Sequence, residues 1–222
     1  MSGLKIITGP AITPVSRTEA RNHLSLDEDI DDNQVRSYLQ AAIDWAENYT
    51  GRFFINRTCQ MMLDGAREID DILWEGMRTG YSMTRYVDHI ELAATPVVSV
   101  ENIKYYNDSD TQSTWSATNY YVDTFSEPAR VVLREGGTYP TDLRVANGIE
   151  INFTAGYGNS ANNVPEAIKL GILQYTAFLF EHRGDGEGVM QPPKVIRSLL
   201  DPYRVLRFNS SPYDTTYRTG VI

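Results

Sequence analysis

Cysteine is almost absent from this sequence of 222 residues, since Cys59 is the only one. No intrachain disulfide can form, which fits folding in a reducing compartment. Long hydrophobic runs are also missing, because charged residues interrupt the apolar stretches, and we therefore expect no membrane-spanning helix. The first residues lack the basic and then apolar layout of a secretory signal, so we expect none.

Positive charge is scarce as well. The chain carries 20 Lys and Arg against 29 Asp and Glu, which gives a formal net charge of −9. A protein that binds DNA through its phosphates needs a basic face, because the release of counterions drives such binding. The composition therefore argues against DNA binding by the molecule as a whole, whereas DNA passing close to an acidic surface would not stick to it.

Patterns typical of catalysis or of metal binding are missing too. The histidines His23, His89 and His182 are far apart in the sequence and show no metal-ligand spacing. The glycines of 184–188 follow a helical pattern and alternate with acidic residues, unlike a phosphate-binding loop after a strand. Cys59 has no recognisable nucleophile context, and the carboxylates form no pair of defined separation. We therefore predict no catalytic, cofactor-binding or metal-binding residues and a protein that is not an enzyme.

Helical patterns are present near the start of the chain. Ser16 and Glu19 have the spacing of a capping box, in which each side chain accepts a hydrogen bond from the other residue's backbone. A second helix is indicated by apolar residues at alternating spacings of three and four: Val35, Leu39, Ala42, Ala46 and Tyr49. Gly51 is well placed to end it in a left-handed conformation.

The middle of the chain is rich in strand patterns. We expect short strands at 58–63, 68–74, 86–92, 97–106, 120–123, 130–133 and 148–154. A polar loop is expected at 76–85. Most connections are short, which favours antiparallel pairing.

Helical patterns return after the strands. Val164 and Pro165 open a third helix that is apolar over more than one face, which predicts burial in the fold or in a subunit interface. A last short helix is expected at 194–200, ended by Pro202. The polar residues 209–222 contain too little apolar surface to fold alone and are expected to become ordered on a partner.

Together these patterns predict an α+β fold. A helical core of three main helices and a short C-terminal helix would carry an inserted antiparallel β-rich domain and an extended C-terminal tail. The expected boundaries are 1–56 for the first part of the helical core, 57–155 for the β-rich insertion, 156–207 for the second part of the core and 208–222 for the tail.

Short motifs occur in a fixed order along the chain. The first part contains Thr18-Glu19-Ala20-x-x-His23-Leu24, Asp31-Asp32 and Tyr49-Thr50-Gly51-Arg52, and Pro96-Val97-x-Ser99-Val100 precedes a strand. The last part contains Phe153-x-Ala155-Gly156-Tyr157-Gly158, Val164-Pro165-x-Ala167-Ile168, Glu181-x-Arg183 and Leu199-Leu200-x-Pro202-Tyr203-Arg204. In this order and spacing, the motifs resemble those of the head–tail connector (adaptor) proteins of long-tailed bacteriophages and gene transfer agents. The region 60–92 matches no motif of that family.

The resemblance implies a structural virion protein of the neck, assembled in the host cytoplasm. Members of the family form a ring, usually of twelve subunits, below the portal protein. A stopper, head-completion or tail-terminator protein binds the lower face of the ring, and DNA crosses the central channel without sequence-specific binding. The β-rich insertion decorates the outside, and the C-terminal segment reaches the portal. No cofactor and no membrane are implied.

Two sets of contact residues follow from this resemblance. The residues expected to bind the portal are Phe208, Tyr213, Tyr217, Arg218, Val221 and Ile222. Among them, Phe208 and Tyr213 would be apolar anchors, and Arg218 would pair with a carboxylate. The residues expected at the interface between subunits are Tyr38, Trp45, Ile172, Tyr175, Phe178 and Leu179.

A different class of function stays open on the sequence alone. The β-rich region could be a carbohydrate-binding or receptor-binding module mounted on the helices. Tyr105, Tyr106, Tyr120 and Tyr121 in the strands suit either an interaction surface or packing across neighbouring strands. A hydrolase would need a convergent site that the sequence does not indicate.

Overall fold

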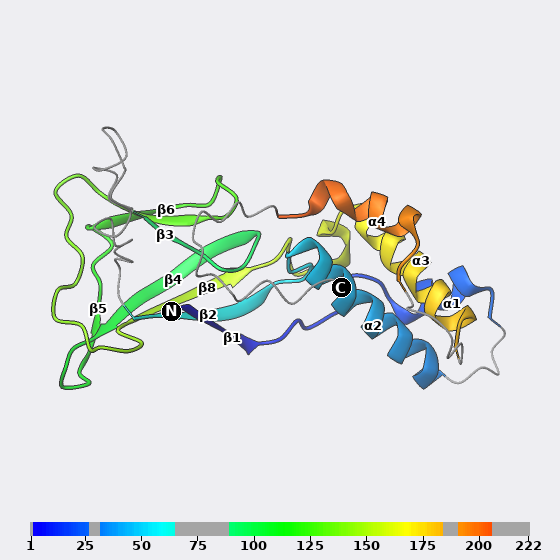
Figure 1. The fold of residues 1–222 in the computed structure, drawn as a ribbon, viewed down its shortest axis with the longest axis horizontal. Coiled ribbons are helices and arrows are strands. Elements are labelled where there is room, and N and C mark those ends of the chain that lie inside the picture. Colours follow the sequence, from blue (N-terminus) through cyan, green and yellow to red (C-terminus); the bar gives the residue numbers. More distant parts are fainter. Residues whose placement is uncertain (1, 27–31, 65–88, 184–190, 206–222) are drawn as a thin grey trace, which may run out of the picture.

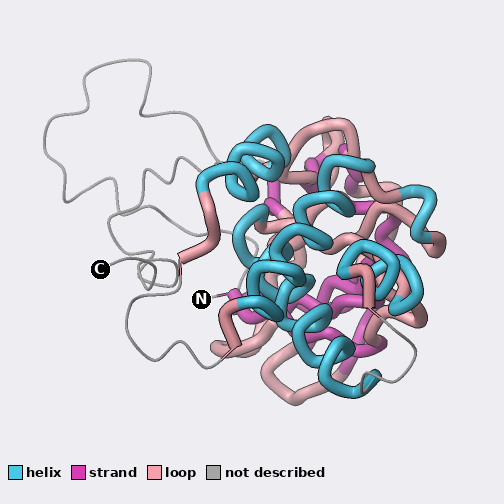
Figure 2. Tube along the Cα trace, turned by 90° about the vertical axis from the view of Figure 1, so that its right-hand side faces the viewer, coloured by secondary structure: helices cyan, strands magenta, loops and turns pink. Residues whose placement is uncertain are grey.

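Helices and strands occupy opposite ends of an elongated molecule (Figure 1). The computed structural model describes residues 2–26, 32–64, 89–183 and 191–205. The helices are α1 (Arg17–Leu24), α2 (Asp32–Thr50), α3 (Glu166–Glu181) and α4 (Lys194–Leu200). Seen from the helical end, they lie in front of the strands (Figure 2).

The predicted signals at the helix ends are confirmed. The Ser16 hydroxyl accepts a hydrogen bond from the Glu19 backbone at 3.2 Å, and the Glu19 carboxylate accepts one from the Ser16 backbone at 2.6 Å. Gly51 follows α2 with a φ of 69°, in the left-handed region that suits glycine. Pro165 is the N-cap of α3 rather than a residue inside its first turn. Pro202 lies in a short 3-10 turn (Asp201–Tyr203) after α4.

The helices enclose a hydrophobic core of their own. The predicted apolar stripe of α2 points into it, and Val35, Leu39, Ala42 and Ala46 are all buried. Its partners come from α1, α3, α4 and the segment after α2: Ala20, Phe54, Ile55, Ile168, Ile172, Ile196 and Leu200. Burial of each large aliphatic side chain here contributes about 1.5–3 kcal/mol to folding.

The strands form two antiparallel sheets. The larger has the order β1-β2-β8-β4-β5, and its strands are β1 (Ser2–Thr8), β2 (Arg57–Leu63), β4 (Val97–Tyr106), β5 (Gln112–Thr114) and β8 (Ile149–Ala155). The smaller has the order β3-β7-β6, and its strands are β3 (His89–Glu91), β6 (Tyr120–Asp123) and β7 (Arg130–Leu133). A second hydrophobic core, which includes Cys59, Ile103, Val131, Ile151 and Phe153, is built from these strands.

The predicted α+β class and antiparallel pairing are thus confirmed, with two differences in detail. The N-terminal segment, for which no strand was predicted, contributes β1, in which Leu4 pairs with Met61 and Ile6 with Cys59. The three-residue strand β5 was not predicted. The strand expected at 68–74 and the loop at 76–85 lie outside the described residues, as do 209–222.

Candidate assembly surfaces

The end of α2 is tied to the strands through Arg52. Its Nε donates a hydrogen bond to the Tyr203 carbonyl at 2.5 Å, and its Nη1 donates one to Glu127 Oε1 at 2.7 Å. Nη2 completes a two-pronged ion pair with the same carboxylate. The bond to Glu127 raises the pKa of Arg52, and the bond from Arg52 lowers the pKa of Glu127. Arg52 therefore joins three segments that are distant in sequence.

The segment after α4 lies along the same helix end. The Tyr49 hydroxyl donates a hydrogen bond to Asp201 Oδ1 at 2.5 Å, and burial, followed by this bond, raises the pKa of Tyr49. The Arg204 guanidinium lies 4.8 Å from the centre of the Tyr49 ring. The Val205 backbone N–H donates to the Thr50 carbonyl at 2.8 Å. Residues 201–205 are thus held on α2 immediately before the tail begins.

A buried ion pair supports the turn between α2 and β2. Glu47 is 8% exposed; its carboxylate accepts a hydrogen bond from the Phe54 backbone at 3.0 Å and another from Arg57 Nη2 at 2.5 Å. Burial raises the pKa of Glu47, while both hydrogen bonds oppose that rise. The Arg57 guanidinium also lies over the Phe53 ring, 4.5 Å from its centre.

Two glycines allow β8 to return close to that turn. Gly156 has a φ of 145°, and a Cβ there would lie 2.5 Å from the Asn56 nitrogen. Gly158 has a φ of 154°, and its carbonyl accepts a hydrogen bond from the Asn56 backbone at 3.0 Å. The Gly156 N–H donates to the Pro96 carbonyl at 2.8 Å. A side chain at Gly156 would require the backbone at Asn56 to move.

Several sequence motifs therefore meet at one place, which we call the junction. It consists of 49–57, Pro96, Glu127, 156–158 and 201–205. The motif residues could be found from the sequence, but their meeting could not. Glu127 belongs to no motif and was missed, because the only signal for it is its contact with Arg52.

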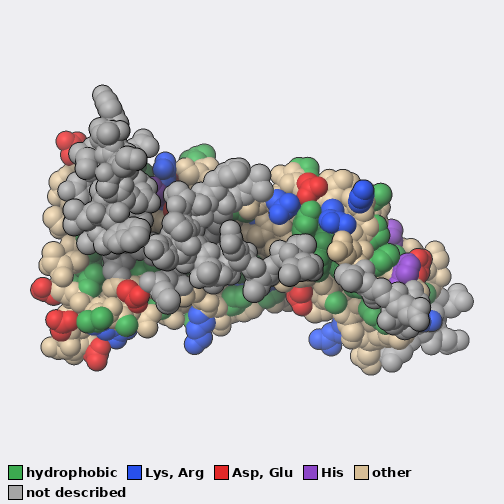
Figure 3. Space-filling model, viewed as in Figure 1, with side chains coloured by type: hydrophobic (Ala, Val, Ile, Leu, Met, Phe, Trp, Pro, Cys, Tyr) green, Lys and Arg blue, Asp and Glu red, His purple; other side chains and the backbone are tan. Residues whose placement is uncertain are grey.

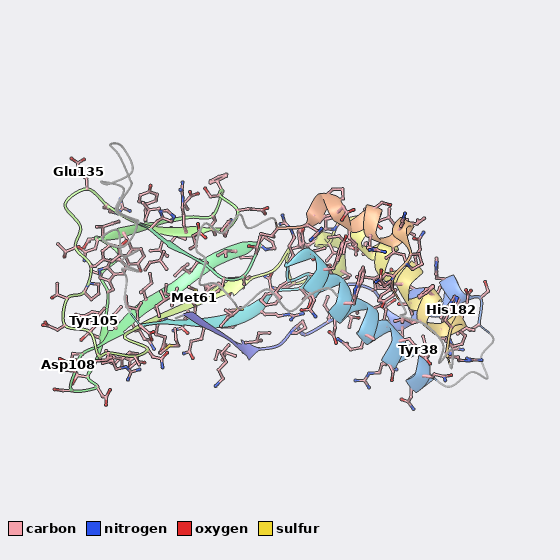
Figure 4. All side chains as sticks on the ribbon, in the orientation of Figure 1. Tyr38, Met61, Tyr105, Asp108, Glu135 and His182 are labelled. Atoms are coloured by element: carbon pink, nitrogen blue, oxygen red, sulfur yellow. The ribbon has the colours of Figure 1, made fainter. Side chains whose placement is uncertain are left out.

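Aromatic side chains form a row along α2 and α3, leading away from the junction. Trp45 stacks on Tyr49 with ring centres 5.0 Å apart and lies 4.6 Å from Tyr175. Tyr175 is 6.3 Å from Phe178, which lies 4.2 Å from the His182 ring. The row thus extends from the junction to the end of α3, where Figure 4 shows His182.

The residues expected at the subunit interface belong to this row or flank it. Tyr38, Trp45, Phe178 and Leu179 are half-buried and keep part of their surface available to a neighbour. Ile172, at 0% exposure, and Tyr175, at 7%, instead pack inside the subunit's own helical core. The apolar circumference of α3 is therefore partly explained by contacts with α2 and α4 in the same chain.

The tip of the helical part is aromatic too. Tyr38 and Phe180 meet edge to face with ring centres 6.0 Å apart. The Arg183 guanidinium lies 4.6 Å from the centre of the Phe180 ring. Figure 4 shows Tyr38 and His182 at this end, opposite Asp108 and Glu135 at the far end of the strands. On the face in Figure 3, acidic side chains gather at that strand end.

The edge strand β1 exposes aliphatic side chains. Leu4, Ile6 and Ile7 are 39%, 43% and 50% exposed, although Leu4 and Ile6 pair with the buried Met61 and Cys59. An edge strand of this kind is a candidate for contact with another chain. The sequence signal for it was the alternation of Leu4 and Ile6, which is too short to predict a strand by itself.

A groove of about 370 Å³ lies between α1, α3 and α4. It is lined by Val15, Glu19, Glu166, Ala167, Lys169, Leu170, Leu173 and Leu199. An ion pair of 2.5 Å between Lys169 and Glu166 forms part of the wall, and Leu170 is 41% exposed. An apolar floor with charged walls suits the docking of a protein segment.

The residues that could take part in catalysis or metal binding are dispersed over the fold. His23 lies on α1, His89 faces Glu91 at 3.7 Å in β3, and His182 caps α3. Among the described residues, no group of His, Cys, Asp and Glu is placed to hold a metal ion. Burial raises the pKa of the Cys59 thiol to about 11, so it is protonated at neutral pH.

Two other expectations concern the tail and membranes. The residues expected to bind the portal, Phe208 to Ile222, lie outside the described residues. In the part of the chain that the structure describes, no helix has the length and apolar character needed to cross a membrane.

Comparison with known proteins finds similar chains in solved structures of the gene transfer agent (GTA) particle. No protein-family model and no curated protein matches the chain. A chain in the solved structure "Virion of native gene transfer agent (GTA) particle" matches with a TM-score of 0.72 at 22% identity, over 94% of this chain and 98% of that chain. A chain in "Neck of empty GTA particle computed with C6 symmetry" matches with the same values, a TM-score of 0.72 and 22% identity.

A third match comes from "Neck of native GTA particle computed with C12 symmetry", with a TM-score of 0.67 at 24% identity, again over 94% of this chain and 98% of that chain. This chain shares its fold with proteins of the GTA particle. The resemblance noted in the sequence is thereby confirmed at the level of the fold, because the match covers 94% of this chain.

Proposed function

We propose that this protein is a structural component of a virion neck, a head–tail connector (adaptor) of the phage and gene-transfer-agent type. The observation that carries the proposal is the fold shared with chains of GTA virion and neck structures over 94% of this chain and 98% of those chains. The structural match extends along nearly the full length of both chains.

The connector would work as a ring, most simply of twelve copies. Neck structures computed with C6 and C12 symmetry support such an assembly. A closed ring is built from heterologous contacts, in which one face of a subunit meets a different face of the next. Half-buried Tyr38, Trp45, Phe178 and Leu179 would contribute to one of these faces, whereas Ile172 and Tyr175 lie in the subunit's own core behind it.

The two ends of the molecule would have different tasks. The helices α1 to α4 would form the wall of the ring, and the β-rich part, 57–155 together with the strand β1 (Ser2–Thr8), would project outward. The tail, 208–222, would bind the portal protein through Phe208, Tyr213, Tyr217, Arg218, Val221 and Ile222. Residues 201–205, held on α2, give this tail a fixed starting point.

The ring would continue the DNA channel and bind a stopper or tail-terminator protein on its lower face. A net charge of −9 would let DNA pass without sequence-specific binding. The particle would be assembled in the host cytoplasm, and the protein would end in the virion neck.

The decisive experiment determines where the chain sits in the mature particle. We expect particle images at side-chain resolution to show twelve copies in the collar between capsid and tail. Native mass measurement of the purified protein, alone and with isolated portal, should show the ring or its formation on the portal. Density for this chain at a tail fibre or on the capsid surface would overturn the proposal.

A further inference from the structure

We infer that neighbouring copies in the ring meet through two different helical faces, and that Arg36 on α2 of one copy pairs with Glu181 on α3 of the next. The inference rests on the proposed function and deepens it, because it names the surfaces that would close the ring. It is carried by two exposed faces on opposite sides of the helical part and by the charges on them.

The first face is the exposed side of α2. The buried stripe of α2 packs into the helical core, which leaves the other side of the helix accessible. A shallow hollow of about 470 Å³ lies along this side and is lined by Asn33, Arg36, Ser37, Gln40, Ala41 and Asp44. Ala41 lies three residues after Tyr38 and four before Trp45, so the hollow adjoins two half-buried aromatic residues expected at the subunit interface.

The second face is the side of α3 that points away from α2. The buried residues of α3 face the core, and a second stripe with spacings of three and four lies about half a turn away from them. This outer stripe consists of Leu170, Leu173, Ala177 and Glu181. Leu170 is 41% exposed and lines, together with Leu173, the groove between α1, α3 and α4. The stripe thus offers apolar surface that a neighbour could cover, with an exposed carboxylate at one end.

The position of the two faces suits a ring. Each copy in a ring contacts one neighbour on either side, and it uses a different face for each. Because α2 and α3 pack against each other within one copy, their outer sides lie on opposite flanks of the helical part. Ser37 and Ala41 have short side chains, so the outer stripe of another copy's α3 can approach α2 closely there.

The direction of the helices decides which charges meet. Within one copy α2 and α3 run antiparallel (Figure 1), and Tyr38, early in α2, contacts Phe180, close to the end of α3. The small rotation between neighbours in a ring of twelve keeps α2 of one copy antiparallel to α3 of the next. Arg36 would therefore lie beside Glu181 of the adjacent copy.

The charges of these two residues are complementary. Arg36 is the only basic residue in the sequence of α2, and Glu181 is the last residue of α3. Both are exposed. An arginine and a carboxylate can form a two-pronged, charge-assisted pair. At the rim of an interface such a pair selects the partner and fixes the register more than it adds affinity.

The first test exchanges the two charges in the full chain. Arg36→Glu alone and Glu181→Arg alone each bring like charges together, so we expect about tenfold fewer closed rings at a fixed concentration. The double variant should restore the rings. Neither change harms its own helix, since acidic residues near a helix start and basic residues near a helix end are favourable. Native mass spectra of the protein, alone and assembled on isolated portal, measure the rings. Glu135→Arg, at the far end of the strands, is the control and should leave the ring mass unchanged.

The second test uses introduced cysteines. Cys59 is buried and its thiol is protonated at neutral pH, so it would not compete with them. Ala41→Cys combined with Ala177→Cys places one thiol on each flank of the same copy. In the ring these thiols come from neighbouring copies and face each other, so oxidation should give a ladder of covalent multimers on denaturing gels. Each single variant should stay a single chain.

The outcomes distinguish the inference from the proposed function. Rings that are insensitive to the charge exchange and give no ladder would overturn the inference alone, because other surfaces would then close the ring. Covalent dimers from Ala41→Cys by itself would also overturn it, since they would show that two α2 faces meet. Absence of rings from the unchanged protein, both alone and on isolated portal, would overturn the inference and the proposed function together.

Discussion

The Tyr49 hydroxyl donates a hydrogen bond to Asp201 at 2.5 Å, although 152 positions separate the two residues. Tyr49 belongs to one of the motifs that carry the family resemblance, and Asp201 lies within another. Their contact brings the two motifs together in the fold. The motif at the end of α2 receives the segment that follows α4, and residues 201–205 are held there by hydrogen bonds from Arg52 to Tyr203 and from Val205 to Thr50.

The close backbone approach at Gly156 predicts a strong effect of a single added methyl group. Gly156→Ala should destabilise the protein by at least about 2 kcal/mol, because the new Cβ would lie 2.5 Å from the Asn56 nitrogen and the φ of 145° is strained for alanine. Urea unfolding measures the change. Gly9→Ala is the control, since a Cβ at Gly9 would meet no atom within 4 Å beyond its chain neighbours. Equal stability of both variants would contradict this prediction and show that the backbone at Asn56 can move at little cost in free energy.

Local patterns in the sequence were sufficient for several elements. The strands predicted at 97–106, 120–123 and 130–133 and the helix predicted at 194–200 have the observed bounds. Each is bounded by turn residues, and its side-chain pattern is complete within a short window. The edge strand β1 was missed because it precedes the helices and becomes a strand only by pairing with β2.

The assembly surfaces depended more on tertiary contacts. The aromatic residues of α2 and α3 were found from their spacing, yet spacing alone could not distinguish half-buried Trp45 from Tyr175, which the same core covers. Glu127 could not be connected with Arg52 either, since the β6–β7 connection reaches α2 only through the complete fold. Sequence periodicity identifies a face, and the packing decides which part of it stays accessible.

The buried pair of Glu47 and Arg57 predicts a large loss of stability when one partner is removed. Glu47→Ala should cost about 3–5 kcal/mol, because it leaves a shielded guanidinium and the Phe54 N–H without their acceptor. Chemical denaturation gives this value directly. Asp44→Ala, at an exposed position of the same helix, should change stability by no more than about 0.5 kcal/mol. A loss below about 1 kcal/mol for Glu47→Ala, as is usual for a surface ion pair, would contradict the role of the pair.

Asp123 predicts how stability depends on acid. Hydrogen bonds from the Ser126 hydroxyl and then from Arg130 lower its pKa from 3.8 to about 2. A lowered pKa means that the folded state holds the charged form, so its contribution is complete above the unfolded value and is lost as the pH falls from about 4 to about 2. Across this pH range, the melting temperature of Asp123→Asn should therefore fall less steeply with decreasing pH than that of the unchanged protein. The same slope for both would exclude Asp123 as a source of the acid sensitivity.

Deletion of 209–222 tests the role of the tail. The described residues form two hydrophobic cores whose members all precede this segment, so the truncated subunit should fold with a melting temperature close to that of the full chain. It should no longer bind isolated portal, because the predicted anchor Tyr213 and the predicted contact residues Tyr217 and Arg218 are lost. Surface binding assays with the full chain as reference measure the difference. Undiminished portal binding by the truncated protein would place the docking site elsewhere.

Tyr38→Ala tests the aromatic tip as a contact between subunits. Within one subunit it removes the edge-to-face pair with Phe180, at a cost of about 0.5–1.5 kcal/mol, which a folded domain tolerates. In a ring the same loss recurs at every interface, so a modest weakening of each contact should strongly reduce the fraction of closed rings. Native mass spectra at several protein concentrations show this as a shift toward single subunits. Tyr121→Ala is the control, because Tyr121 is 45% exposed on β6 in the part that would face away from the ring. Rings of unchanged mass and stability in Tyr38→Ala would show that the aromatic tip is not part of the interface. Trp45, Phe178 and Leu179 would then remain as the candidate interface residues.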